Sequence, residues 1–462
     1  MRSAASAAVL IASYYFPPDA AVGALRLGRF ARLLPEFGWQ PIVLTVQDEL
    51  RDQGFDHGRL EGLETIEIVP TREWPRLWRR IRGIVSGLRL GNRAIAPPIS
   101  NSVASGSRRS GPVIATIKRW IVSLAVLFPD DKKHWAGRAA VTAVRLIRRD
   151  RIRHVLTSGP PFSTHFVGLA SKWFTGARWL ADFRDPWIDM LPDRFPDTRS
   201  LLSDALERRM ESVVVRTADR VIVTTPRMRD AFRLRYPRID SDKFVCIPNG
   251  IDVDKFDTAG THRQPPLTIT YAGSLYFDRT PEPLFRAVHD LLSSGRITQT
   301  DLRIQLIGRC DSSNGVQTQT LVARYGLEPA VRILGTVPYD EALRLMRESH
   351  LLLALAPERH RLVVPAKLYD YLGSGTRILA IAEEGATADL IRETESGVCF
   401  SESDSNGLRE FLAELITSRT FETKRNEPES FPQFNARYLT SRLVALLSPA
   451  ATNAVGEVEV QG

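Results

Sequence analysis

The stretch Ala7-Ala8-Val9-Leu10-Ile11-Ala12-Ser13, followed directly by Tyr14-Tyr15-Phe16-Pro17-Pro18-Asp19, decides the fold class. A short apolar run that ends abruptly in a proline-containing turn predicts a buried β-strand rather than a signal peptide. Beyond the turn, apolar side chains from Leu27 to Leu34 have the spacing of one helix face, and Gly38 is placed to end that helix. The chain therefore opens with the strand, turn and helix of an α/β protein.

The same alternation continues in two series. Apolar runs separated by helical patterns predict further strands at 41–46, 66–70, 153–157, 178–183 and 220–224, and then at 267–272, 302–308, 331–334, 350–354 and 377–381. A segment rich in Pro, Gly and Asp at 247–266 separates the two series and is typical of a linker. The pattern predicts an α/β fold of two Rossmann-like, doubly wound domains that face a central cleft. We expect the domains at 1–255 and 266–430, a C-terminal helix at 431–448 and a disordered tail at 449–462.

Composition excludes several classes of protein. With 462 residues, 43% hydrophobic and 25% charged, the chain is large enough for two globular domains. Cys246, Cys310 and Cys399 lie far apart, so neither a zinc site nor a disulfide framework is indicated, and a reducing cytoplasm is favoured. No apolar run approaches the roughly 20 residues that cross a bilayer, and the nearest is 120–128.

Positive charge is concentrated in one stretch. Residues 72–153 contain 19 Lys or Arg and four Asp or Glu, an excess of 19 − 4 = 15, although the whole chain carries only +9. Four of its eight tryptophans, Trp74, Trp78, Trp120 and Trp135, lie there too. We interpret 72–135 as an insertion in the first domain that meets anionic lipid headgroups. A solvated basic face with core tryptophans is the alternative, whereas nucleic-acid binding lacks any recognition motif.

The first turn offers an anion site. Its residues 16–23 lead into a helix carrying Arg26, and Gly23 lets backbone amides approach a phosphate, unless this is a plain turn. No Gly-x-Gly-x-x-Gly follows a strand, which argues against a nicotinamide or flavin enzyme.

Six motifs, in this order, resemble the family-4 glycosyltransferases of bacterial exopolysaccharide and lipopolysaccharide biosynthesis. They are Tyr15-Phe16-Pro17-Pro18 with Gly23 and Arg26, Thr157-Ser158-Gly159-Pro160-Pro161-Phe162, Asp182-Phe183-Arg184-Asp185-Pro186-Trp187, Pro248-Asn249-Gly250-Ile251-Asp252, Tyr271-Ala272-Gly273-Ser274-Leu275 and Pro365-Ala366-Lys367-Leu368-Tyr369-Asp370-Tyr371-Leu372. The resemblance runs from the first strand to about Phe400. It implies the GT-B fold and retaining transfer from a nucleotide-sugar donor, held by the second domain, to a saccharide acceptor at the first. The acceptor would be membrane-associated and polyprenyl-linked, the enzyme would lie at the inner face of the plasma membrane, and no metal or other cofactor would be needed.

The resemblance also assigns donor residues. Arg279, beyond the Gly273-Ser274 turn, matches the family's basic residue on the donor diphosphate, and Lys367 is a second candidate for that charge. Asp370 matches the acid that binds the donor ribose. The family's preceding glutamate would fall at Leu362.

A substitute for that glutamate lies nearby. Glu358 is our candidate, with His360 and Arg361 in the same loop. Both cations of the donor site could alternatively be ordinary surface residues.

In the first domain, relatives place a histidine where this chain has Arg184. Asp182 and Asp185 flank it, and either could orient an acceptor hydroxyl or stabilise charge at the anomeric carbon. An internal Asp–Arg ion pair is the structural alternative. His165 either faces the cleft or is an ordinary helix residue. Asp240-Ser241-Asp242 and Asp252-Val253-Asp254 imitate a metal-binding motif, and we interpret both as coincidence.

Two other functions remain open at this point. A nucleotide-sugar epimerase or hydrolase can share the same fold and donor site. A non-catalytic subunit of the GT-B type would explain the missing glutamate and histidine.

Overall fold

A computed structural model describes residues 7–50, 54–73, 129–190, 201–256, 265–276, 278–418 and 428–448. The first domain is built on seven parallel strands in the order β3-β2-β1-β4-β5-β6-β7. These are β1 (Ala7–Ala12), β2 (Trp39–Val46), β3 (Glu67–Thr71), β4 (His154–Gly159), β5 (Arg178–Phe183), β6 (Arg220–Val223) and β7 (Phe244–Cys246). Its helices are α1 (Gly23–Leu33), α4 (Lys133–Asp150), α5 (His165–Thr175), α7 (Leu201–Thr217) and α8 (Pro226–Arg235).

The second domain repeats this plan with six parallel strands in the order β12-β9-β8-β13-β14-β15. They are β8 (Leu267–Ala272), β9 (Leu302–Ile307), β12 (Val331–Gly335), β13 (Leu351–Ala356), β14 (Ile378–Ala382) and β15 (Gly397–Phe400), with a small hairpin of β10 (Ser312–Ser313) and β11 (Val316–Gln317). The helices are α9 (Glu282–Ser293), α10 (Thr318–Arg324), α11 (Tyr339–Glu348), α12 (Lys367–Ser374), α13 (Ala386–Glu393) and α14 (Ser405–Ser418). The predicted fold class, two doubly wound α/β domains, is confirmed.

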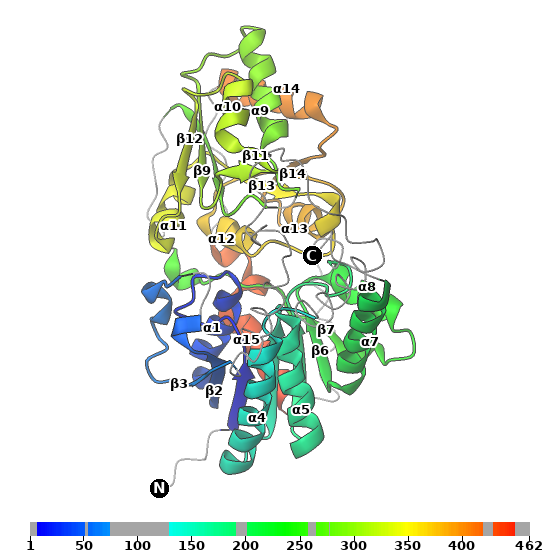
Figure 1. Ribbon diagram of the computed structural model, residues 1–462. Coiled ribbons are helices and arrows are strands. Elements are labelled where there is room, and N and C mark those ends of the chain that lie inside the picture. Colours follow the sequence, from blue (N-terminus) through cyan, green and yellow to red (C-terminus); the bar gives the residue numbers. More distant parts are fainter. Residues whose placement is uncertain are drawn as a thin grey trace, which may run out of the picture.

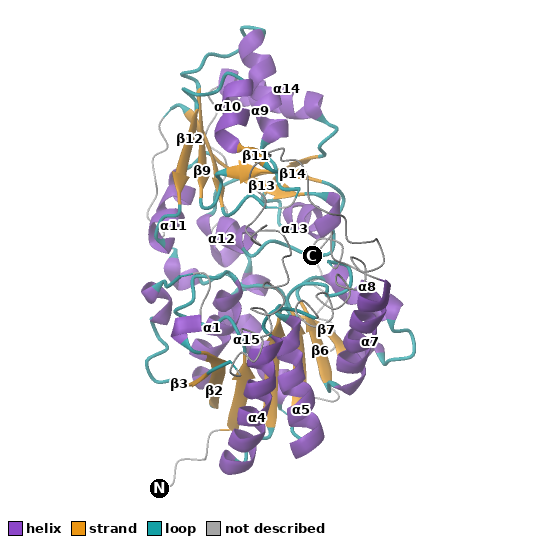
Figure 2. Cartoon of the chain, viewed as in Figure 1, coloured by secondary structure: helices purple, strands orange, loops and turns teal. Residues whose placement is uncertain are grey.

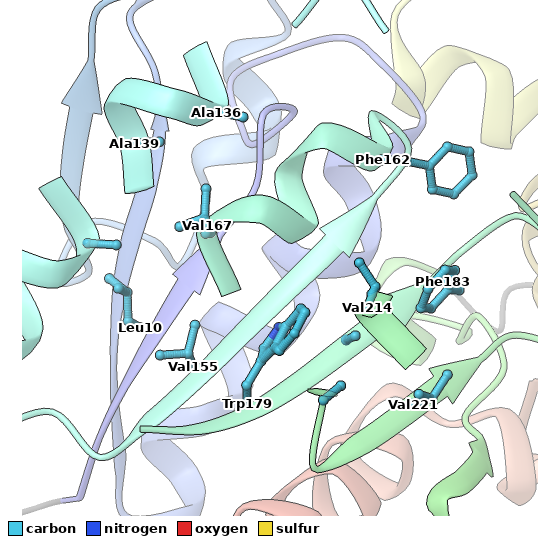
Figure 3. Packing of buried hydrophobic residues seen from close by; sticks show 14 of the residues in the cluster. Leu10, Ala136, Ala139, Val155, Phe162, Val167, Trp179, Phe183, Val214 and Val221 are labelled. Atoms are coloured by element: carbon cyan, nitrogen blue, oxygen red, sulfur yellow. The ribbon is translucent and has the colours of Figure 1, made fainter. Parts of the chain in front are cut away.

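Each central strand is buried on both faces because helices cover both (Figure 2). In β1, Leu10 and Ala12 join a core beneath α4 and α5, while Val9 and Ile11 join the opposite core beneath α1. Side chains alternate between the faces of a strand, which explains why a parallel strand reads as a continuous apolar run. Figure 3 shows the first of these cores, with Trp179 at its centre.

The chain returns to the first domain at its end. Helix α15 (Ala436–Leu447) packs beside α1 and places Leu439, Leu443 and Leu447 in the same core as Leu27 (Figure 1). A helix was predicted at 431–448, but its place in the first domain was not.

Strands β7 and β15 were not predicted, because runs of three and four residues give little periodicity.

The prediction that Trp135 faces lipid is wrong: it is fully buried in α4, with its ring 5.3 Å from that of Tyr14. Residues 74–128, which hold Trp74, Trp78 and Trp120, and the predicted tail lie outside the described residues. Among the described helices, none is long and apolar enough to span a bilayer.

Candidate functional site

The carboxyl ends of both sheets face each other across the space between the domains (Figure 1), which is where doubly wound proteins bind ligands. On the side of the second domain, β8 ends at Ala272 and Gly273 follows with φ of +142°, a value that disfavours any side chain. A Cβ there would lie 3.3 Å from Nζ of Lys367, the first residue of α12. The turn and the helix start therefore meet closely.

Lys367 places a buried amino group at this point. Its Nζ lies 3.3 Å from the centre of the Tyr271 ring and has no hydrogen-bond partner in the described part of the chain. Burial, and secondarily the charge of Arg279, holds the pKa of Lys367 well below its ordinary value. A buried ammonium without a hydrogen-bonding partner is unfavourable, so this arrangement favours an anionic ligand.

Arg279 is the second cation of the turn. It is buried, its Nη1 donates to the hydroxyl of Tyr276 at 2.6 Å, and its guanidinium lies 4.5 Å from the centre of that ring. Its Nε has no hydrogen-bond partner among the described residues. The structure thus brings together Gly273, Lys367 and Arg279, as expected of a diphosphate site. Ser274 lies in the same turn, partly exposed, and its carbonyl accepts from Tyr271 at 2.8 Å.

The loop after β13 borders this group. Glu358 begins the short helix η8 (Glu358–His360) and is exposed, as is Arg361, while His360 is buried. Arg359 forms an ion pair of 3.1 Å with Asp278, next to Arg279. The role of Glu358 toward the sugar stays a prediction.

Asp370 lies at an interdomain contact. It is buried and accepts from the hydroxyl of Tyr339 at 2.9 Å and from Nη2 of Arg29, in the first domain, at 3.4 Å. Burial raises its pKa, an effect that the Arg29 charge opposes. Sequence reasoning did not anticipate this contact, and the role of Asp370 toward a ribose stays a prediction.

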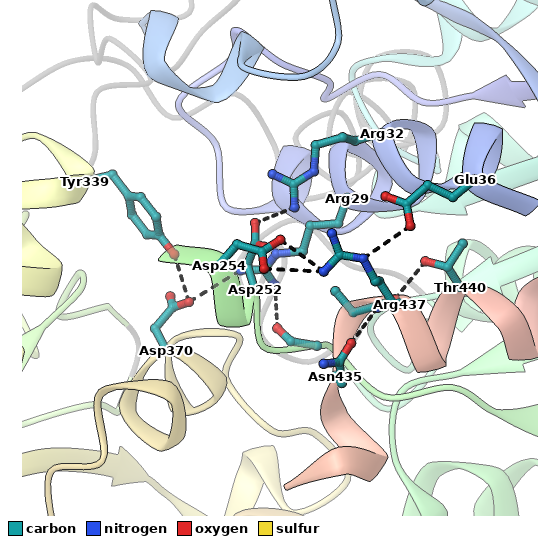
Figure 4. Close-up of polar contacts among 12 residues, drawn as sticks. Arg29, Arg32, Glu36, Asp252, Asp254, Tyr339, Asp370, Asn435, Arg437 and Thr440 are labelled. Carbon is teal, nitrogen blue, oxygen red and sulfur yellow. Dashed lines mark hydrogen bonds and ion pairs between the residues drawn. The ribbon is translucent and has the colours of Figure 1, made fainter. Parts of the chain in front are cut away.

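Three arginines of α1 make this contact part of a larger network, of which Figure 4 shows Arg29 and Arg32. Arg26, Arg29 and Arg32 are three residues apart and share one helix face. Arg26 donates to the carbonyls of residues 247 and 248, and Arg29 to that of Gly250 at 2.6 Å. Arg32 pairs with Asp252 at 2.6 Å. Helix α1 therefore contributes three side chains that hold the linker.

The aspartates that imitate a metal motif form ion pairs or cap a turn. Asp252 pairs with Arg32, and Asp254 pairs with Arg437 of α15 at 3.1 Å. Asp240 caps the turn that begins at Ser241. Ion pairs and capping account for these carboxylates.

In the first domain, Asp182 forms a buried ion pair with Arg26, at 2.9 Å, and accepts from Ser158 Oγ at 2.7 Å. The expected alternative of an internal Asp–Arg pair is therefore present, but its arginine is Arg26 and not Arg184. With its oxygens engaged below the surface, Asp182 is placed to orient Arg26 and the linker, and its role toward an acceptor stays a prediction.

Arg184 occupies the space over Gly23. A Cβ on Gly23 would collide with the guanidinium of Arg184, whose Nη2 donates to the carbonyl of Pro160. Its Nε has no hydrogen-bond partner in the described structure. Burial lowers the pKa of Arg184, and Asp185 beside it acts in the opposite direction. Gly23 thus makes room for a cation beyond the carboxyl ends of β1 and β5, and the expected approach of its amide to an anion stays a prediction.

His165 is fully buried at the start of α5. Thr157 Oγ1 accepts from Trp179 Nε1 at 2.8 Å and lies 2.9 Å from His165 Nδ1, so the ring is held by a hydrogen bond inside the core. Burial lowers the pKa of His165 to about 3. The imidazole is therefore neutral, and it is an internal residue.

Family models match most of the chain. Residues 102–255 match glycosyltransferase family 4, and residues 252–430 match glycosyl transferases group 1. This chain belongs to the family-4 glycosyltransferases, and it has the GT-B fold. The protein is accordingly a transferase, as the sequence motifs predicted.

Solved structures share this fold at low identity. Sucrose-phosphate synthase from Thermosynechococcus elongatus aligns with a TM-score of 0.63 and 13% identity, over 95% of this chain and 98% of the other. Anabaena HepE, solved with UDP-glucose, aligns at 0.60 and 13%, over 95% and 99%. The lipopolysaccharide glycosyltransferase WaaG aligns at 0.56 and 13%, over 96% and 100%. A search of curated proteins found no match.

Proposed function

We propose that this glycosyltransferase moves a sugar from a nucleoside-diphosphate sugar to a membrane-associated, polyprenyl-linked saccharide, with retention and without a metal ion. The observation that carries the proposal is the pair of incompletely hydrogen-bonded cations, Lys367 and Arg279, beside Gly273 at the carboxyl end of β8. The UDP-glucose bound to HepE, a protein of the same fold, supports a nucleotide-sugar donor.

The reaction requires the bond from the anomeric carbon to the donor phosphate to break as a bond to the acceptor oxygen forms. The acceptor hydroxyl gives its proton to the departing diphosphate on the same face of the sugar. Lys367 and Arg279 stabilise the charge that develops on that diphosphate, which is the task a metal ion has in other transferases.

Transfer to extracted lipids tests the proposal. Tritiated UDP-, GDP- and ADP-sugars would be incubated with the protein and a bacterial lipid extract, with and without EDTA. We expect one sugar to enter the organic phase whether or not EDTA is present, and Lys367→Met to reduce the rate at least a hundredfold. Arg344→Ala, which changes an exposed arginine of α11, is the matched control.

Two results would contradict the proposal. The labelled sugar could be epimerised or released as free sugar without reaching the lipid phase. Transfer could instead stop when EDTA is added and resume with a divalent cation.

A further inference from the structure

The end of the first domain opposite the second domain carries an exposed aromatic pair. Trp173 and Phe174 lie in the last turn of α5, and their exposed fractions are 62% and 64%. Gly176, with φ of +72°, ends the helix just beyond them. In Figure 1 this end of α5 forms, with the end of α4, the tip of the molecule farthest from the second domain. Adjacent exposed aromatic side chains are a recurring mark of interaction surfaces.

Exposed arginines lie at the end of α4, and one of them contacts this pair. Arg148 Nη2 donates to the carbonyl of Phe174 at 3.0 Å, which fixes the two helix ends to each other. Arg145 and Arg149 are exposed on the same helix, and Arg153 is exposed just after it. We call Trp173, Phe174 and these four arginines the basal surface.

Further cations extend the basal surface on its other side. Lys172 precedes Trp173, and Lys243 lies near enough to Lys172, Arg216 and Arg220 for their charges to act against its protonation. Three carboxylates belong to the same region. Asp219 accepts from Lys172 at 2.8 Å, Asp150 from Arg149 at 2.7 Å, and Glu67 lies 3.9 Å from Arg149. The carboxylates are fewer than the cations and are already paired, so the region keeps a positive excess.

We propose that the basal surface docks the protein on an anionic phospholipid bilayer. The indole of Trp173 has an apolar body and a polar edge and so favours the headgroup level, Phe174 adds apolar area, and arginines bind lipid phosphates. Nucleic acid also carries phosphates, but a protein that stacks bases arranges its rings along a groove. Here the two rings stand together at a protruding helix end, which suits a planar surface.

This orientation has a consequence that rests on the proposed function. The cleft lies at the opposite edge of the seven-stranded sheet, and six-residue strands place it about 20 Å from the basal surface. The acceptor would therefore have to present its sugar at that height above the headgroups. A lipid-linked oligosaccharide meets this requirement, and a sugar attached directly at the headgroup does not.

Vesicle binding tests the docking surface without any transfer reaction. The full chain would be sedimented with phosphatidylglycerol-containing vesicles and with pure phosphatidylcholine vesicles. We expect binding to the anionic vesicles only, weaker at high salt, and at least tenfold weaker for Trp173→Ala/Phe174→Ala and for Arg145→Ala/Arg149→Ala. Tyr438→Ala, at a 48% exposed position of α15, and Arg296→Ala are matched controls that should bind like the wild type.

Quenching of tryptophan fluorescence by lipids locates the contact between the protein and the bilayer. Lipids brominated on their acyl chains should quench tryptophan emission more strongly in the wild type than in Trp173→Phe. The proposal is overturned if the basal variants bind like the wild type, because the bilayer contact then lies elsewhere, for example in 74–128. It is also overturned by equal quenching of both proteins, or by binding to duplex DNA without binding to vesicles.

Discussion

At the scale of single residues, the donor site depends on a lysine whose surroundings disfavour its charged form. Lys367 is buried beside Tyr271 and Arg279 with no hydrogen-bond partner in the described structure. A bound diphosphate would supply the missing negative charge and stabilise the protonated form. Donor binding and protonation of Lys367 should therefore be linked.

The linkage predicts a pH dependence with a definite sign. The free protein has the depressed pKa and the complex has a raised one, so UDP binding takes up a proton between these two values. Within that window, we expect the UDP dissociation constant to rise with pH by up to tenfold per pH unit. Calorimetry of UDP binding in buffers of different ionisation enthalpy measures both the affinity and the proton uptake.

The matched variant is Lys367→Arg, whose side chain stays charged throughout this range. It should lose the proton uptake and most of the pH dependence. Equal proton uptake in wild type and variant would assign the titration to another group.

The burial of His165 predicts a loss of folding stability at acid pH. Its pKa is near 6.5 in the unfolded chain and about 3 in the folded protein, so only the unfolded state gains a proton as pH falls below 6.5. This protonation of the unfolded state should lower the free energy of unfolding by about 2 kcal/mol between pH 7 and pH 5. Urea denaturation at both pH values measures it.

His165→Gln removes the titrating group, so the wild-type loss minus the variant loss isolates the histidine. A difference near zero would show that the imidazole is protonated in the folded protein, contrary to its burial. Other titrating groups cancel in this comparison.

At the scale of elements, α1 connects the parts of the molecule. Its buried pair of Arg26 and Asp182 anchors the carbonyls of the linker. Removing one partner leaves a charge buried without compensation, which typically costs 3–5 kcal/mol, about tenfold more than an exposed pair. We expect Asp182→Asn to lower the free energy of unfolding by that amount.

The control for this prediction is Glu341→Gln, which breaks an exposed pair with Arg344 on α11. It should change stability by less than about 1 kcal/mol. Comparable losses in both variants would mean that the Arg26 pair is not the anchor described here. Denaturant unfolding of the two variants, measured side by side, gives both free energies of unfolding.

The strands were predictable because a parallel strand buried on both faces is a continuous apolar run. The strands at 178–183 and 267–272 have the predicted bounds, and Gly38 ends its helix segment in the left-handed conformation, as expected. Partners between distant segments were not predictable. The regular spacing of Arg26, Arg29 and Arg32 was visible in the sequence, but nothing local indicated Asp182, Asp252 and Asp370 as their acceptors.

For the candidate site, motifs indicated which residues gather but not how they are used. Gly273, Arg279 and Lys367 do lie together, because they follow strand ends at one edge of a sheet. Trp135 and His165 were ambiguous, since burial depends on packing partners far along the chain. The structure places both in the interior.

At the scale of the whole molecule, the two domains are joined by more than the linker. Thr225 donates to the carbonyl of Leu362 at 2.6 Å, and Arg227 pairs with Asp389. Helix α15 packs against the first domain and completes the core that contains Leu27. The first domain is therefore incomplete without the C-terminal segment.

Truncation tests this dependence. Ending the chain after residue 430 removes Leu439, Leu443 and Leu447, each fully or almost fully buried. At about 1.5–3 kcal/mol for each side chain, the loss is comparable to the whole stability of a domain. We expect the first domain to unfold, whereas a chain ending after Ser448 should keep its melting temperature. Calorimetry would contradict this account if both truncated proteins melted alike.

The central claim, that Lys367 and Arg279 hold the diphosphate of a nucleotide sugar, has one most direct test. The melting temperature of the wild type, Lys367→Met, Arg279→Met and the control Arg344→Ala would be recorded with UDP, GDP, ADP and their common sugars. One nucleotide series should stabilise the wild type and the control by mass action and leave the two site variants unchanged. Stabilisation of all four proteins alike would contradict the claim, as would stabilisation of none.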